Sequence, residues 1–427
     1  MNYFAHKNGE LYCEDVAVAE IATAVGTPFY LYSKKTLLRH FQSFDSGFAG
    51  TRHLTCFAVK ACSNVAILHL FASAGGGADI VSGGELFRAL KAGIDPGRII
   101  YSGVGKTEDE LRYALEAGIL LFNVESGQEL DRLQRIAVSL GKEAPVSFRV
   151  NPDVDPLTHA YISTGLAKNK FGIPIREAMP LYQRAAAMEG IAVKGISCHI
   201  GSQLTQISPF VESMTKIRAF VHSLVENGIS VEYIDLGGGG GITYDDETPP
   251  HPHDYAGAVL KELEGLDCTL ILEPGRVIVG NAGILVTEVQ YTKTNRGGEA
   301  GKKFVIVDAA MNDLARPSLY GAYHTIQPVR ETGAARETVD IVGPICETGD
   351  FIAKDRALAG VVQGDLLAVM SAGAYGFSMS SNYNSRPRVA EVLVDGGHFA
   401  GIRRRETFDQ LIQGEIIPEG REAGHDQ

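Results

Sequence analysis

The chain has 427 residues, 45% of them hydrophobic and 21% charged, and a formal net charge of −12. This length favours two domains, and the composition is that of a globular protein. Because the acidic excess would repel a phosphate backbone, nucleic acid is excluded as an expected partner.

Cysteine usage and the first residues indicate a cytoplasmic protein. The six cysteines stand singly, without a C-x-x-C pair, so they signal no metal site and suit a reducing compartment. Residues 1–10 lack a basic stretch followed by an apolar core, so no signal peptide is expected. No apolar run approaches the roughly 20 residues that a bilayer span requires, so no membrane association is expected.

Strand and helix patterns alternate through most of the chain after a strand- and turn-like start with a short helix near Ala17–Val25. The predicted strands are Leu54–Val59, Ala78–Val81, Ile99–Ser102, Ile119–Val124, Val146–Val150, Val193–His199, Val231–Leu236 and Thr269–Glu273. The predicted helices are Asn64–Ala74, Gly84–Ala92, Glu108–Ala117, Gly127–Leu140, Arg176–Met188, Pro209–Val225 and Tyr255–Leu263. Capping residues expected for them include Ser63, Thr107, Ser126 and Ser208.

The strands are short apolar runs, which is typical of a parallel sheet buried on both faces. Eight alternations over about 220 residues predict an α/β fold of the (β/α)8 TIM-barrel type. The last third instead has strand-like runs with turns between them, at Ile284–Thr292, Lys303–Val307, Thr338–Val342, Asp365–Ser371 and Arg388–Val394. We therefore expect a barrel over residues 34–275 and a second all-β domain, a barrel or sandwich, built from 1–33 plus 276–427.

Five consecutive glycines, Gly237 to Gly241, follow the predicted strand Val231–Leu236. Glycine lets backbone amides approach a ligand closely, so a run of this kind after a strand predicts an anion-binding loop, usually for a phosphate. A flexible linker is the alternative, but the run lies between an apolar strand and Ile242 and has no Ser-rich or charged flanks.

Candidate functional residues stand at the ends of the predicted barrel strands, where TIM barrels carry their active sites. Lys60 ends the first strand, Asp79 lies on the second, His199 ends the sixth and Glu273 ends the eighth. A strand-end Lys is often a surface cation and a lone His is often structural, but their joint placement favours a site on one rim.

This combination points to pyridoxal phosphate. A Lys at an apolar strand end can have a lowered pKa and form a Schiff base. The cofactor also needs a phosphate site and an acidic partner for its pyridinium nitrogen. We expect Glu273 to be that partner, His199 to stack on the ring, and the glycines to take the phosphate.

Seven short motifs in this order resemble the fold type III pyridoxal-phosphate decarboxylases, and within them the group that acts on diaminopimelate. The motifs are Phe57–Ala61, Ser197–Ser202, Asp235–Gly239, Glu273–Arg276, Arg316–Tyr320, Gly343–Glu347 and Gly373–Gly376. The resemblance runs over almost the whole chain.

The resemblance implies a role for each matching position. Lys60 would hold the cofactor covalently, with Asp79, His199 and Glu273 around it. The phosphate would be held by Ser202, Gly238, Gly239, Gly275, Arg276 and Tyr375. Arg276, Arg316 and Tyr320, with Tyr375, would bind the substrate's distal carboxylate and Glu347 its distal amino group, while Cys346 would lie near the reacting carbon as a proton donor. In the family, Cys346 and Glu347 enter the neighbouring subunit's site, which implies a homodimer with shared active sites.

The implied reaction is decarboxylation of meso-2,6-diaminopimelate at its D-centre to L-lysine and carbon dioxide, the last step of lysine biosynthesis. Cys346 or Lys60 would return the proton to the α carbon. The acidic residue after Cys346, together with Arg316, suits a substrate with an amino group and a carboxylate at its far end. One departure from the family is Gly240, where a bulkier residue is common.

Other interpretations stay open from the residues alone. The chain could decarboxylate carboxynorspermidine, ornithine or arginine, act as an amino-acid racemase, or bind the cofactor without catalysis. Cys346 could be a small buried hydrophobe, and Arg316 and Tyr320, four residues apart, could be a pair on a helix surface.

Overall fold

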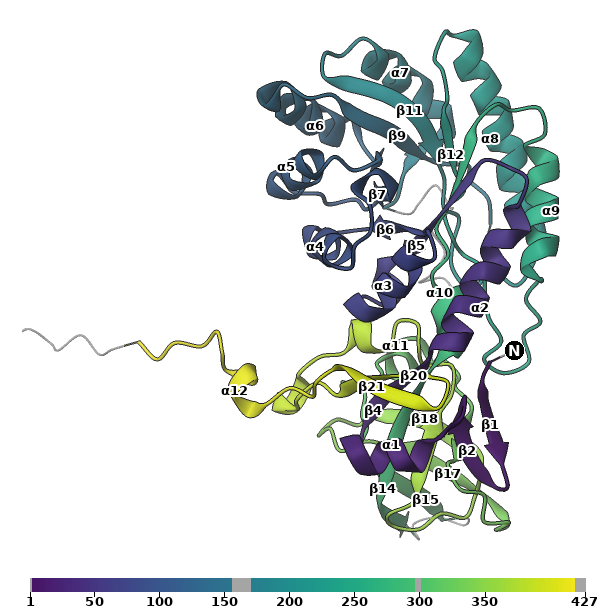
Figure 1. Cartoon of the computed structure of the whole chain (residues 1–427), viewed down its shortest axis with the longest axis vertical. Helices are drawn as coiled ribbons and strands as arrows, with labels where there is room; N and C mark the ends of the chain where they lie inside the picture. The colour runs from purple at the N-terminus through teal and green to yellow at the C-terminus, as the bar shows by residue number, and fades with distance from the viewer. Residues whose placement is uncertain (1, 156–169, 296–300, 419–427) are drawn as a thin grey trace, which may run out of the picture.

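A computed structural model describes residues 2–155, 170–295 and 301–418. It contains a closed eight-stranded parallel barrel surrounded by helices, and below it, in the view of Figure 1, a mostly β domain. The predicted fold class is therefore confirmed.

The barrel is built from β5 (His53–Ala58), β6 (Gly77–Ile80), β7 (Ile99–Tyr101), β8 (Leu121–Val124), β9 (Ala144–Asn151), β11 (Ile191–Ser197), β12 (Tyr233–Asp235) and β13 (Thr269–Leu272). Neighbouring strands pair in parallel, and β13 returns to β5, which closes the barrel. A two-residue strand, β10 (Ile173–Pro174), extends β9. Strand ends move slightly from prediction: Lys60, His199 and Glu273 lie just beyond their strands.

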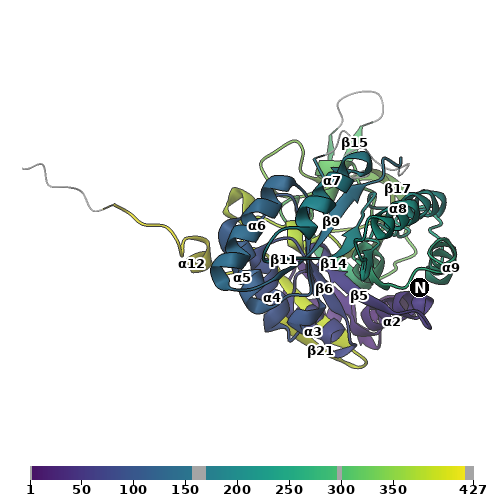
Figure 2. The same ribbon diagram turned by 90° about the horizontal axis from the view of Figure 1, so that it is seen from above.

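Eight helices accompany the barrel strands, and Figure 2 shows them arranged around it: α2 (Lys34–Asp45), α3 (Val65–Ser73), α4 (Gly83–Lys91), α5 (Glu108–Ala117), α6 (Gly127–Leu140), α7 (Ile175–Ala186), α8 (Ser208–Glu226) and α9 (Pro252–Glu262). The capping roles of Thr107 and Ser126 are confirmed. Those of Ser63 and Ser208 are wrong, because the Asn64 side chain caps α3 and Ser208 lies inside α8. Helix α2 was not predicted.

The barrel interior is divided between apolar and polar side chains. Cys56, Ile100, Leu121 and Ile271 form a small apolar cluster separate from the main core. The main core fills the layer between strands and helices, for example where the Phe57 and Phe71 rings lie 4.6 Å apart. Buried polar side chains such as Ser102, Asp235 and Glu273 lie at or just beyond the carboxyl ends of their strands, where a TIM barrel places its chemistry.

The second domain contains a sheet ordered β18-β17-β15-β14-β4-β20-β21. Its strands are β4 (Phe29–Ser33), β14 (Gly283–Asn295), β15 (Lys302–Val307), β17 (Arg336–Val342), β18 (Phe351–Ala359), β20 (Ala390–Asp395) and β21 (His398–Arg403), with β16 (Ile326–Pro328) and β19 (Leu366–Val369) attached to β14. Strand β4, from the N-terminal segment, lies between β14 and β20 in this sheet. Strands β16, β18 and β21 were not predicted.

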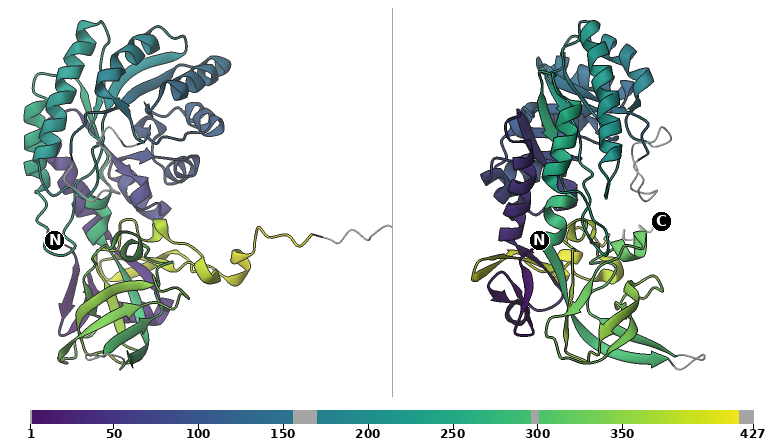
Figure 3. Two further views of the ribbon diagram at one scale, coloured as in Figure 1. Left: turned by 180° about the vertical axis from the view of Figure 1, so that it is seen from behind. Right: turned by 90° about the vertical axis from the view of Figure 1, so that its right-hand side faces the viewer.

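The N-terminal residues form a small antiparallel sheet of β1 (Phe4–Lys7), β2 (Glu10–Cys13) and β3 (Val16–Ala17), followed by α1 (Val18–Val25). This sheet lies beside the β domain in Figures 1 and 3. Three short helices complete the fold: α10 (Arg276–Val279), α11 (Arg316–Tyr320) and α12 (Phe408–Leu411). Among the described residues, no helix has the length and apolar character needed to cross a membrane.

A buried carboxylate, Glu391 on β20, joins the two domains. It accepts hydrogen bonds from Tyr32 on β4 and from Asn64, the residue that caps barrel helix α3, at 3.0 and 2.8 Å. It also forms an ion pair with Arg403 on β21. One 1%-exposed side chain thus connects three elements of the junction.

We expect Glu391→Ala to destabilise the junction by about 3–5 kcal/mol, because it leaves a charged partner and two buried polar groups unpaired. The midpoint of urea unfolding measures this effect. Glu337→Ala is the control, since its ion pair with Lys303 is partly exposed and should contribute no more than about 1 kcal/mol. Equal midpoints for the two variants would contradict the role of Glu391.

Candidate active site

Residues from the ends of four barrel strands line one cavity. Lys60 lies in the 3-10 turn Val59–Ala61 after β5, and Glu273 follows β13 directly. Both line a cavity that also includes His199, which follows β11 by two residues, and the glycine loop. Asp79, on β6, contacts the cavity through Lys60. The structure therefore brings together the strand-end residues that were singled out in the sequence.

Lys60 forms an ion pair with Asp79, with Nζ donating to Oδ2 at 2.7 Å. Asp79 is fully buried, whereas the Lys60 side chain is 34% exposed. Burial disfavours the ammonium, but the carboxyl groups of Asp79 and Glu273 outweigh it and raise the pKa of Lys60. The predicted lowered pKa is wrong, because the expectation considered the apolar strand and not these two acids.

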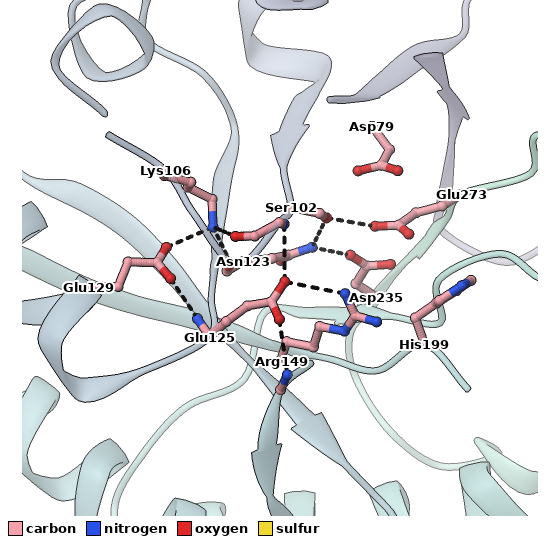
Figure 4. Close-up of polar contacts among 12 residues, drawn as sticks. Asp79, Ser102, Lys106, Asn123, Glu125, Glu129, Arg149, His199, Asp235 and Glu273 are labelled. Atoms are coloured by element: carbon pink, nitrogen blue, oxygen red, sulfur yellow. Dashed lines mark hydrogen bonds and ion pairs between the residues drawn. The ribbon is translucent and has the colours of Figure 1, made fainter. Parts of the chain in front are cut away.

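Glu273 belongs to a buried polar network in the barrel interior, shown in Figure 4. Ser102 donates to Glu273 at 3.2 Å, and Asn123 donates to both Ser102 and Asp235. Burial and the neighbouring Asp235 raise the pKa of Glu273 well above its usual value. Burial also raises the pKa of Asp235 to about 6. The two hydrogen-bonded carboxyl groups therefore retain a proton near neutral pH.

His199 is held as a neutral imidazole. Its Nδ1 accepts the Gly238 N–H at 3.1 Å, so Nδ1 carries no proton. Burial, together with the charges of Arg149 and Lys60, keeps the pKa of His199 well below its usual value. A neutral, flat ring on the cavity wall can stack on an aromatic ligand without adding charge to the site.

The glycine loop is anchored by several hydrogen bonds, so it is not a flexible linker. The N–H of Gly237 donates to Asp235, and that of Gly241 to the Leu204 carbonyl. With Gly238 committed to His199, the amides of Gly239 and Gly240 make no hydrogen bond to the described residues. Both of these glycines line the cavity. Two unpaired amides facing one space form a binding site for an anion.

Close packing explains why only some of these glycines must lack a side chain. A Cβ at Gly238 would collide with the Glu273 carbonyl oxygen. Gly239 has a φ of +117°, and a Cβ there would lie 2.5 Å from the Gly201 carbonyl oxygen. A Cβ at Gly240 would meet only Val277, at 3.8 Å. The structure therefore accommodates at Gly240 the bulkier residue that the family commonly carries.

Two buried arginines lie around the Tyr244 side chain. Arg276 donates to the Tyr244 hydroxyl at 2.6 Å and to Ser202 Oγ at 3.2 Å. The Arg316 guanidinium lies over the Tyr244 ring, 4.5 Å from its centroid. Both arginines are 7% exposed, and neither forms an ion pair with a described carboxylate. The 7% exposure of Arg316 excludes the helix-surface interpretation of Arg316 and Tyr320.

These arginines line a larger cavity of about 300 Å³. It adjoins the first cavity, because both are lined by His199, Ser202, Arg276 and Tyr375. Tyr320 lines it too, with Gln203, Tyr244, Glu247, Ala322, Tyr323 and Met379. Sequence reasoning missed Tyr244, although it follows the glycine run by three residues.

Tyr375 lines both cavities and has an unusual backbone conformation. Its φ is +54°, a value that residues with a side chain rarely adopt. Its N–H donates to the Ala61 carbonyl at 2.8 Å, next to Lys60, and its ring lies 4.9 Å from the Arg276 guanidinium. The backbone of Gly275 contacts the same turn, because a Cβ there would lie 3.1 Å from those of Ala58 and Ala61.

Cys346 and Glu347 lie apart from this site. Both are exposed, and neither lines the two cavities. The Cys346 N–H donates to Asn384 Oδ1 at 2.9 Å, which anchors the segment at the surface. The interpretation of Cys346 as a buried hydrophobe is therefore wrong.

The donor set of the two cavities fits pyridoxal phosphate. Two unpaired amides and a buried arginine can bind an anion, Lys60 supplies an amine, and Glu273 supplies a carboxyl group. Two buried atoms next to the cavity, Asp79 Oδ1 and Arg276 Nε, have no hydrogen-bond partner among the described residues. No group of three described His, Cys, Asp or Glu residues is arranged to bind a metal.

Comparison with known proteins supports this interpretation. Residues 34–280 match the family model of the pyridoxal-dependent decarboxylase, pyridoxal binding domain. A diaminopimelate decarboxylase of Pseudomonas aeruginosa is 54% identical over 417 residues, which cover 98% of this chain and 99% of the relative. The structure of diaminopimelate decarboxylase from Helicobacter pylori complexed with L-lysine superposes with a TM-score of 0.89 at 44% identity, covering 92% of this chain and 98% of the other. The enzyme from M. jannaschii gives a TM-score of 0.92 at 40% identity, over 97% and 98%.

We expect Gly238→Ala to destabilise the protein by about 1–3 kcal/mol, because its Cβ must displace the Glu273 backbone. Gly240→Ala, two residues away, should leave stability within about 0.5 kcal/mol, because its Cβ meets no close atom. Thermal unfolding of the two variants measures the difference. A Gly238→Ala midpoint equal to that of Gly240→Ala would show that the loop is not closely packed.

Proposed function

Since the chain belongs to the pyridoxal-dependent decarboxylases, and within them to the diaminopimelate decarboxylases, we propose that its paired cavities convert meso-2,6-diaminopimelate to L-lysine and carbon dioxide. The protein is a carboxy-lyase of lysine biosynthesis that uses pyridoxal phosphate. The observation that carries this function is the pair of buried arginines beside the Lys60–Asp79 ion pair, because they offer a carboxylate site next to a reactive amine.

The bound cofactor supplies a carbonyl that joins to amines and a ring that accepts the electrons released when a carboxylate leaves. Lys60 is the amine that holds it. Because Asp79 and Glu273 raise its pKa, Lys60 must lose a proton before it can react. Asp79 Oδ2, 2.7 Å from Nζ, is the nearest base, and its buried position keeps that proton close to the site.

Glu273 and Asp235 retain a proton next to the place of the cofactor ring. Glu273 lines the cavity, Asp235 is buried behind it, and the pair carries a proton that burial keeps in place. With the cofactor bound, Glu273 would present a proton to the ring nitrogen, and the Ser102–Asn123 pair fixes the orientation of the Glu273 carboxyl group. His199, neutral and bound to Gly238, covers one face of the ring.

The phosphate end is held by residues from the glycine loop and its surroundings. Arg276 supplies the charge, and the unpaired amides of Gly239 and Gly240 supply donors. Gly238 contributes by lacking a side chain, since its own N–H is used by His199. Ser202, Gly275, Arg276 and Tyr375, which all line the cavity, complete the phosphate site together with Gly238 and Gly239.

The substrate's distal carboxylate binds in the larger cavity against Arg276 and Arg316, with Tyr320 and Tyr375 on its walls. Burial strengthens an arginine–carboxylate contact, because water no longer screens it. Positioning of this kind contributes several kcal/mol when it holds the reacting carboxylate in place. A substrate without the distal carboxylate leaves both charges uncompensated.

A second copy of the chain would supply the contact to the distal amino group and, through Cys346, one of the two candidate proton donors, the other being Lys60. Glu347 would bind the amino group and Cys346 would protonate the α carbon, but both lie at the surface, away from this chain's own cavities. A two-fold dimer places them in the partner's site. We therefore infer a homodimer with shared active sites.

The setting of the protein follows from its composition. Six free cysteines, five of them buried, suit the reducing cytoplasm, and a net charge of −12 disfavours nucleic acid. Residues 34–275 act as the cofactor-binding domain, while 1–33 plus 276–427 supply substrate and dimer contacts.

Purified protein supplied with pyridoxal phosphate and meso-diaminopimelate should release L-lysine and carbon dioxide in equal amounts. Lys60→Ala should lose nearly all turnover and the bound cofactor's absorbance. Arg316→Ala should lower kcat/KM for diaminopimelate by about 100-fold or more, because a buried charged contact is lost. Any activity with ornithine or arginine, which lack the distal carboxylate, should be much less affected. An equal loss with all of these substrates would exclude the carboxylate role of Arg316.

Mixed dimers test whether the sites are shared. Lys60→Ala and Glu347→Ala are each expected to be inactive, yet a dimer with one chain of each has one intact site. Unfolding and refolding an equal mixture should restore about one quarter of wild-type activity, because half of the dimers are mixed and each has one working site. The matched control mixes Lys60→Ala with Glu273→Ala. Because these two residues belong to the same site of one chain, no activity should return.

A further inference from the structure

His324, a residue outside the cavity lining, makes the only hydrogen bond of the Arg316 side chain among the described residues. Arg316 donates from its terminal nitrogen to His324 Nε2 at 2.9 Å. On the other side of the ring, Nδ1 lies 2.8 Å from the Met370 carbonyl oxygen. His324 is fully buried. The ring therefore links the β domain's backbone to a substrate-facing guanidinium.

These two contacts determine the protonation state of His324. A carbonyl oxygen can only accept, so Nδ1 carries the proton and donates to Met370. Guanidinium can only donate, so Nε2 presents its lone pair to Arg316. The ring is therefore neutral with a single proton on Nδ1. Burial and the Arg316 charge are consistent with this state, because they lower the pKa of His324 to about 3.

The backbone around His324 is held by strand pairing. His324 precedes β16 and Met370 follows β19, and these two strands pair in antiparallel register from Ile326 and Val369. Met370 in turn donates its N–H to the Thr325 carbonyl at 2.8 Å. The ring therefore extends an existing ladder of backbone hydrogen bonds, and Arg316 is fixed to that ladder through it.

Tyr244 fixes Arg316 from a second direction. Its ring lies under the guanidinium and meets the His324 ring edge-on, with centroids 5.3 Å apart. Its hydroxyl accepts from Arg276. The two arginines are therefore held apart by an aromatic ring, and each keeps its remaining N–H groups for a ligand.

We propose that His324 is a positioning residue, which holds Arg316 in place to bind the distal carboxylate and so contributes to recognition of diaminopimelate. This inference rests on the proposed function. In this role, the Nε2 lone pair of His324 accepts one N–H of Arg316. The remaining N–H groups of Arg316 are then directed toward the cavity. Substrates or products that lack the distal carboxylate gain nothing from this arrangement.

The experiment compares His324→Asn with His324→Gln in the holoenzyme. An Asn amide occupies the place of Nδ1 and can still bond to Met370 but does not reach Arg316. A Gln amide oxygen reaches the place of Nε2 and preserves the acceptor. His324→Asn should raise KM for diaminopimelate and weaken L-lysine binding by about tenfold, with kcat changed less. His324→Gln should stay within about threefold of wild type.

Calorimetry with L-lysine and with 1,5-diaminopentane separates this role from a structural one. The two ligands differ by the carboxylate, so His324→Asn should weaken L-lysine alone. In the Arg316→Ala background, His324→Asn should have no further effect on L-lysine, because its action passes through Arg316. If His324→Asn lowers the thermal midpoint, His324→Phe, which keeps a ring but accepts no hydrogen bond, takes its place in every measurement.

The possible results separate the positioning role of His324 from the proposed function. Equal weakening of both ligands, or an additive loss in the double variant, would overturn the positioning role and leave the proposed function intact. Wild-type protein that neither turns over diaminopimelate nor prefers L-lysine to 1,5-diaminopentane would instead overturn the proposed function. Wild-type preference with an unchanged His324→Asn variant would overturn the inference alone.

Discussion

The site depends on two positive charges that are buried side by side and have no carboxylate partner among the described residues. Arg276 and Arg316 both contact Tyr244, which bonds to one and lies under the other. Removing charges from water is costly unless they are paired, so this arrangement is far more stable when an anion is bound. The fold tolerates it because hydroxyl, imidazole and aromatic groups satisfy part of each guanidinium. The strongest binding energy in the cavity is thereby reserved for anionic ligand groups.

The barrel interior provides the opposite charge. Asp79, Asp235 and Glu273 are all buried within the carboxyl ends of the strands, and in the part of the chain that the structure describes only Lys60 forms an ion pair with this group. Ser102 and Asn123 fix the carboxyl groups, and burial keeps a proton among them. The cavity is thus acidic toward the barrel and basic toward the β domain. A ligand with a basic ring nitrogen and anionic ends has a single favourable orientation in such a field.

The sequence predicted the barrel and the convergence of Lys60, His199 and Glu273, because a closed parallel barrel brings every strand's carboxyl end to one rim. It could not predict the ionisation of Lys60, which depends on two acids from other strands. Nor could it show that Gly238 uses its N–H for His199, or that Gly240 has room for a side chain. Arg316 and Tyr320 looked like a surface pair because helical spacing carries no information on burial. No local sequence pattern marks His324, because its role depends on a hydrogen bond to Met370, 46 residues later.

The placement of β4 has a consequence for how the chain is made. Phe29–Ser33 is entirely buried between β14 and β20, which belong to the last third of the sequence. During synthesis this apolar strand emerges early, and its partners follow only after the whole barrel has been translated, a delay on the order of ten seconds or more. Until then Phe29, Tyr30, Leu31 and Tyr32 have no native neighbours in the sheet. The nascent protein therefore carries an unpaired strand through most of translation, and the second domain assembles only when the polypeptide is almost complete.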